Sequence, residues 1–180
     1  MFGRFKKRNL QRHIALKLYN NLVLYARSPE FYIHYGVPDS ELGRFEMICL
    51  HAYLLFKRLG KTDESGKYLS QLIHDLMFTD LDRTLREKGI GDMGIGKRIK
   101  TLARNLYGRV DAYDNALKKG DNSLMKALNR NLYATSAADE KQIAAMIYYV
   151  KESLHQLNSQ SNSEIMQGNV VFPKASYEKS

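Results

Sequence analysis

Cysteine, proline and long apolar runs are all scarce in this 180-residue sequence. The single cysteine, Cys49, excludes an internal disulfide, and its apolar neighbours indicate a small buried hydrophobe in a reducing compartment. The three prolines leave nearly all of the chain free to form helices. The longest apolar run, residues 48–56, contains His51, and it is far shorter than the roughly 18 residues that a transmembrane helix needs.

Acidic residues are absent from positions 1–29, which carry seven bases, whereas the rest of the chain carries 21 bases and 19 acids. The net charge of +9 is therefore concentrated at one end. Because bases precede an apolar stripe there, this segment is typical of helices that lie on membranes, and it also suits RNA or a ribosome. The candidate contact residues of this segment are Arg4, Lys6, Lys7, Arg8 and Arg12. Polar interruptions at Lys17, Asn20 and Asn21 argue against a secretory signal, while an organellar transit segment stays open.

Apolar residues recur at three- and four-residue steps along most of the chain, which predicts helices and no strand. The predicted helices span residues 6–26, 40–59, 63–88, 92–119, 121–134 and 137–157, with Ser40 or Asp39 and Asp63 or Thr62 as caps and a capping box at Ser136–Asp139. The fold class is therefore all-α, a single helical domain over residues 1–158 with six principal helices. Residues 159–180 lack a packing face, and we expect a disordered, mobile tail there.

A glycine cluster at residues 89–98 satisfies one dinucleotide-binding pattern and nearly satisfies a P-loop. Both need a preceding strand, whereas a helical pattern leads into this cluster, and Arg98 stands where a P-loop needs a hydroxyl. We interpret the cluster as a helix end, a tight turn and a new helix. The bases that follow, Lys97, Arg98, Lys100 and Arg104, form either a solvated face or a contact for an anionic partner group.

Asp80 projects from the apolar face of the helix predicted over residues 63–88. A carboxylate aimed at a core costs several kcal/mol unless it is paired. We therefore predict a structural ion pair of Asp80 with Arg44 or Arg109. The alternative is a local kink that lets Asp80 reach water.

His51 and the dipeptide His74-Asp75 resemble the histidine and aspartate set of helical metal phosphohydrolases, with Asp111 as the last ligand. Successive residues on a helix point about 100° apart, so His74 and Asp75 diverge. A satisfied core histidine is the simpler interpretation of His51. We expect no catalytic residue, no metal site and no cofactor.

Several short motifs together resemble the ubiquinol–cytochrome c chaperone family over residues 18–135. They are Tyr19, ARSPEFY at 26–32, GVPD at 36–39, GRF at 43–45, MFTDLD at 77–82, LRE at 85–87, GIGD at 89–92, GKRIK at 96–100, YGR at 107–109 and AY at 112–113.

The resemblance implies an assembly chaperone for the respiratory cytochrome bc1 complex that is not an enzyme. It implies newly made cytochrome b as the client, met near the ribosome and an anionic membrane surface, with a small partner protein and no DNA. The short N-terminus is more similar to a bacterial member on the cytoplasmic face of the inner membrane, with a mitochondrial origin as the alternative. A metal phosphohydrolase and a basic RNA-binding module remain the competing functions.

Overall fold

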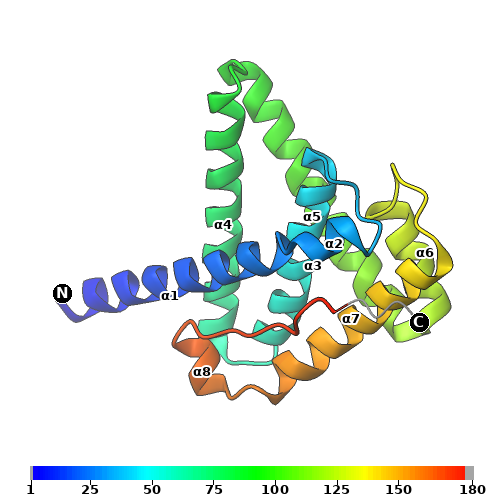
Figure 1. Cartoon of the computed structure of the whole chain (residues 1–180). Coiled ribbons are helices and arrows are strands. Elements are labelled where there is room, and N and C mark those ends of the chain that lie inside the picture. Colours follow the sequence, from blue (N-terminus) through cyan, green and yellow to red (C-terminus); the bar gives the residue numbers. More distant parts are fainter. Residues whose placement is uncertain (1, 177–180) are drawn as a thin grey trace.

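The computed structural model describes residues 2–176, with side chains from residue 6 onward, and every regular element in that range is a helix (Figure 1). The all-α prediction is confirmed. The helices are α1 (Phe2–Ala26), α2 (Pro29–Ile33), α3 (Glu41–Leu59), α4 (Glu64–Glu87), α5 (Asp92–Lys119), α6 (Asp121–Asn131), α7 (Glu140–Ser159) and α8 (Asn162–Met166). The six long helices correspond to the six predicted from apolar spacing.

Helix α3 is the centre of the fold, because it packs against α1, α4, α5 and α7. Its residues 49–55 are buried without a break, as expected for an apolar run surrounded by other helices. Helices α4 and α5 diverge from a shared tip, α1 crosses α4, and α6 and α7 lie on the opposite side of the molecule (Figure 1). The core therefore runs along α3.

The helix ends show which local signals set the boundaries. The Ser40 hydroxyl accepts a hydrogen bond from the Gly43 amide at 3.1 Å, and the Asp63 carboxylate accepts one from Ser65 at 3.0 Å, so two predicted caps are confirmed.

The predicted capping box of α7 is misplaced by three residues. The box is formed by Asp139 and Gln142, whose side chains each bond the other residue's backbone amide. The Ser136 hydroxyl instead donates to the Gly36 carbonyl at 3.2 Å. Ser136 therefore holds a loop to the body, and α7 begins after it.

The chain after α7 is ordered as far as the structure describes it, so the predicted disordered tail is wrong for residues 159–176. Ile165 and Phe172 are buried in the core. Buried Arg58 of α3 holds the turn into this segment, since its guanidinium donates at 2.8 Å to the carbonyls of Leu157 and Gln160. Residues 177–180 lie outside the described range.

The segment from α8 to residue 176 forms a strap along α1. Gly168 has a φ of +84°, and a Cβ at this glycine would lie 2.9 Å from the Cβ of Lys17, so the strap needs glycine where it meets α1. Further along, the Phe172 ring packs at 5.3 Å from Tyr25 and 5.0 Å from His51, measured between ring centroids. The few apolar residues of the strap therefore complete a part of the core whose other residues come from helices far away in the sequence.

Candidate functional site

An open groove of about 720 Å³ lies among α1, α3, α4 and α5, near the tip that α4 and α5 share. Its size is in the range of ligand clefts. The apolar residues that line it are Leu42, Phe45, Ile48, Met77, Leu81, Leu85 and Leu102. The groove is mainly apolar and open to solvent on a face where the two diverging helices leave α3 uncovered.

The floor and the wall of the groove differ in burial. Phe45 and Met77 are buried in the core beneath it, whereas Leu42 at its edge is 43% exposed. Leu42 belongs to the first turn of α3, and Gly43 lets that turn press against the preceding loop, because a Cβ there would lie 1.9 Å from the Pro38 carbonyl oxygen. A rigid turn thus presents an exposed leucine to the groove.

The rim of the groove carries five bases, of which two are paired with acids. Arg44 binds Asp39 at 2.8 Å, and Lys88 binds Glu41. The Lys88 ammonium holds the pKa of the Glu41 carboxyl below its ordinary value by its hydrogen bond and its charge.

The other three rim bases are Arg27, Lys97 and Arg98, which are exposed. They form no ion pair with any side chain that the structure describes. The rim is therefore positively charged beyond what its own acids neutralise.

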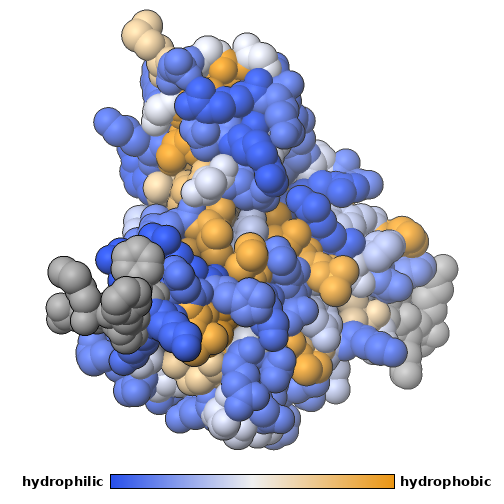
Figure 2. Space-filling view, turned by 90° about the vertical axis from the view of Figure 1, so that its left-hand side faces the viewer, coloured by the Kyte–Doolittle hydropathy of each residue, from blue (hydrophilic) through white to orange (hydrophobic). Residues whose placement is uncertain are grey.

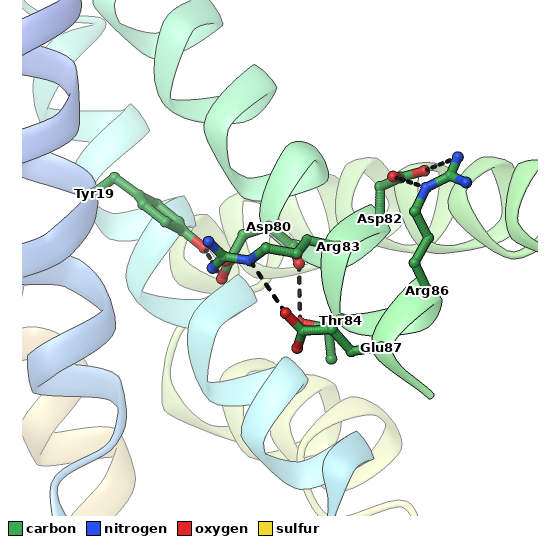
Figure 3. A network of polar contacts seen from close by, with 7 residues as sticks. All are labelled: Tyr19, Asp80, Asp82, Arg83, Thr84, Arg86 and Glu87. Atoms are coloured by element: carbon green, nitrogen blue, oxygen red, sulfur yellow. Dashed lines mark hydrogen bonds and ion pairs between the residues drawn. The ribbon is translucent and has the colours of Figure 1, made fainter. Parts of the chain in front are cut away.

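Asp80 lies on the groove wall and belongs to a polar network that extends along α4 (Figure 3). The Tyr19 hydroxyl donates to Asp80 at 3.1 Å, and Arg83 pairs with the same carboxylate. Burial, together with the charge and the hydrogen bond of Asp80, raises the pKa of Tyr19. The network ties α1 to α4 beside the groove.

The predicted pairing of Asp80 with Arg44 or Arg109 is wrong. Arg44 is held by Asp39, and Arg109 by Glu46. The Asp80 side chain is 29% exposed at the groove wall, so Arg83, three residues further on the same helix, reaches it from solvent.

A buried ion pair that the sequence analysis missed joins α3 to α5. Glu46 is 1% exposed, and its carboxylate accepts from the Arg109 guanidinium at 2.5, 2.8 and 3.1 Å. This geometry is bidentate and charge-assisted. The sequence carried a signal for this pair, since Glu46 is a charged residue two positions before the apolar run at residues 48–56.

The histidine and aspartate set does not form a metal site. Both ring nitrogens of buried His51 are engaged, Nδ1 with the Met47 carbonyl at 2.9 Å and Nε2 with the Tyr149 hydroxyl at 2.8 Å, and burial lowers its pKa to about 4. His74 instead lies between α4 and α5, with its Nε2 3.2 Å from the Tyr107 hydroxyl.

Asp75 and Asp111 are exposed. In the described part of the chain, no three His, Cys, Asp or Glu side chains are grouped as a metal ion would require. His74 Nδ1 lies 3.3 Å from the Asp75 carboxylate, but buried His51 has both ring nitrogens engaged elsewhere, so the set proposed for a phosphohydrolase is not brought together.

The glycine cluster forms the tip between α4 and α5, as interpreted from the sequence. Gly89 adopts a φ of +75° after the end of α4, and Gly91 caps α5. Arg86 and Asp92 pair across the tip. A helix leads into the glycines, so the strand that nucleotide-binding loops need is replaced by α4.

The two sets of predicted contact bases lie apart. Lys6, Lys7, Arg8 and Arg12 are exposed on the half of α1 that projects from the body, while the side chain of Arg4 lies outside the described residues. Lys97 and Arg98 line the groove near the tip, and Lys100 and Arg104 are exposed on α5 outside it. Figure 1 shows the start of α1 and the tip of α4 and α5 at different corners of the molecule.

The side of the molecule where α1 begins and α4 runs has hydrophobic residues gathered across its middle, among hydrophilic ones (Figure 2). Leu10 and Leu16 of α1 are 58% and 43% exposed. None of the helices within residues 2–176 is both long and apolar enough to span a bilayer.

Comparison with known proteins gives a consistent result. The family model described as ubiquinol-cytochrome C chaperone matches residues 33–172. The chain is 24% identical over 152 residues to ubiquinol-cytochrome c reductase complex assembly factor 1 of Mus musculus, covering 84% of this chain and 52% of that protein. It is 25% identical over 146 residues to Protein CBP3, mitochondrial, of Saccharomyces cerevisiae, covering 79% of this chain and 44% of that protein.

The chain thus spans about half the length of these two relatives. A solved structure, the Cbp3 homolog from Brucella abortus, superposes with a TM-score of 0.84 at 34% identity, covering 97% of this chain and 98% of that one. The matched region includes α3, α4, α5 and α7 in full. The chain therefore belongs to the ubiquinol-cytochrome C chaperone family.

Proposed function

We propose that this chain is a non-enzymatic assembly chaperone for the cytochrome bc1 complex, and that its groove holds an apolar segment of newly made cytochrome b. The observation that carries the proposal is the open apolar groove, which the four helices keep uncovered although burying it would stabilise the fold. The relatives' names, which describe assembly factors for ubiquinol-cytochrome c reductase, support the choice of complex.

The groove suits temporary holding of a client. A segment that buries about 300 Å² of apolar surface gains about 7 kcal/mol. Association itself costs at least about 4 kcal/mol. The remainder corresponds to weak, reversible binding, which a chaperone needs because the client must leave for the final complex.

We propose that the protein acts at a membrane surface near the ribosome, and the charge of α1 supports this location. Its first half is basic and lacks acids, and Leu10 is exposed there, so the support for this location is the attraction of these bases to an anionic surface. The bacterial inner membrane and the mitochondrial inner membrane both present such a surface. A small partner protein is part of the proposal as well.

A variant of α1 tests this location. Replacing Lys6, Lys7, Arg8 and Arg12 by glutamine should weaken sedimentation with anionic vesicles strongly at low salt, because each base near an anionic surface contributes about 1 kcal/mol. Ribosomal RNA is the competing target, and a steep salt slope with RNA together with no vesicle binding would contradict a membrane role.

Substitution in the groove tests the client proposal. Leu42→Asp places a charge on an exposed groove position, and Tyr148→Asp makes the same change on α7, where the side chain is 69% exposed and outside the groove. In the native host, the Leu42 variant should reduce haem b absorbance and ubiquinol–cytochrome c reductase activity, while the Tyr148 variant should not. Normal complex levels with Leu42→Asp present at wild-type abundance would contradict the proposal.

A further inference from the structure

We infer that the groove selects apolar segments that carry acidic residues beside the apolar stretch. This inference rests on the proposed function and adds to it the chemistry of the client. The basis is the charge of the rim, which belongs to the same groove as the apolar lining.

The rim has a net positive charge that its own acids do not neutralise. Among its acids, Glu41 binds Lys88, and Asp80 is satisfied by the Tyr19 hydroxyl and Arg83. Arg27, Lys97 and Arg98 form no ion pair with a described side chain, and Glu41, whose pKa the charge of Arg98 helps to lower, is already bonded to Lys88. An occupant with acidic flanks would supply the missing partners.

The three bases without an ion pair come from two sides of the groove. Arg27 directly follows the last residue of α1, whereas Lys97 and Arg98 lie near the start of α5, and α1 and α5 each pack on both α3 and α4. Positive charge therefore borders the groove from more than one of its walls. A segment with basic flanks would bring like charges to these walls, so the rim discriminates against it.

A set of matched peptides tests the selection. Three fluorescent peptides share one apolar stretch and differ only in their flanks, which are Glu-Glu, Ser-Ser or Lys-Lys. Anisotropy should show about tenfold tighter binding of the glutamate peptide than of the lysine peptide at low salt, because each exposed charge pair has a modest effect. The difference should shrink in about 0.5 M salt, where exposed charges are screened.

Charge reversal assigns the selectivity to the groove. The double variant Lys97→Glu/Arg98→Glu should invert the preference. The double variant Lys126→Glu/Arg130→Glu makes the same change in net charge on exposed positions of α6 and should leave the preference unchanged. Circular dichroism of both variants controls for folding.

The outcomes separate this inference from the proposed function. Equal affinity for the three peptides, lost equally in Leu42→Asp, would overturn the charge selection and leave the client groove standing. Failure of every peptide to bind would overturn both.

Two other occupants are tested in the same assay. Displacement of the peptides by a short-chain phosphatidylglycerol below its micelle concentration, with tighter binding than the glutamate peptide, would assign the groove to lipid and overturn the inference. A dimer that Lys97→Glu/Arg98→Glu dissociates, seen by sedimentation, would assign it to a second copy of the chain and do the same.

Discussion

Removing the arginine of the buried ion pair should destabilise the fold strongly. Arg109→Met keeps most of the side-chain volume but leaves the Glu46 carboxylate, which is 1% exposed, without its bidentate partner. An unpaired buried charge costs about 3–5 kcal/mol. Urea unfolding followed by circular dichroism at 222 nm should show this loss as a lower transition midpoint with an unchanged slope.

The double variant Glu46→Met/Arg109→Met should recover most of that loss. The desolvation cost of both charges disappears, and two methionines fill a similar volume, so we expect a stability within about 1 kcal/mol of the wild type. Arg44→Met, which removes the exposed pair with Asp39, is the control and should change stability by less than about 1 kcal/mol. If Arg109→Met cost no more than Arg44→Met, water would reach Glu46, and the buried ion pair would not stabilise the fold as we expect.

Two further predictions concern the interior around α3. The folded state binds a proton at His51 only near pH 4, whereas the unfolded chain binds it near the ordinary pKa of 6.5; stability from this residue is therefore complete above pH 6.5 and falls by about 3 kcal/mol as the pH drops to 4. His51→Gln should flatten the stability profile over that interval, and an unchanged profile would contradict a neutral buried imidazole. Phe172→Ala should cost about 3–5 kcal/mol in urea unfolding, because the ring is buried against Tyr25 and His51; a cost below about 1 kcal/mol would show that the strap is detached in solution.

Local signals made the helices predictable. The caps at Ser40 and Asp63 and the turn at Gly89 are determined by side chains and backbone angles within a few residues. The central position of α3 follows from its apolar run. These features depend on short stretches of sequence, which is why spacing and residue type were sufficient to find them.

Long-range partners were not predictable in the same way. The C-terminal residues Ile165 and Phe172 have too few apolar neighbours in the sequence to indicate packing, and the rings that Phe172 contacts, Tyr25 and His51, lie more than a hundred residues earlier. The sequence pattern predicts an ion pair of Asp80 with a distant arginine, because it shows on which helix face Asp80 lies but not how deeply the side chain is buried. Its exposure at a groove wall made a neighbour on the same helix the better partner.

The groove was likewise not predictable from the sequence. An apolar stripe predicts that a helix packs, and it does not show where a partner helix diverges and leaves part of the stripe uncovered. Leu42, Leu81 and Leu102 fit a core pattern in the sequence, and they line an open groove because α4 and α5 diverge.

Site-specific crosslinking tests whether the groove holds an apolar segment of cytochrome b. A photoreactive amino acid at Leu42, inside the groove, and one at Tyr148, on α7, are both placed at exposed positions. In host cells that are synthesising the bc1 complex, we expect an adduct between position 42 and an apolar segment of cytochrome b and none from position 148. Crosslinks to cytochrome b from position 148 but not from position 42 would contradict it.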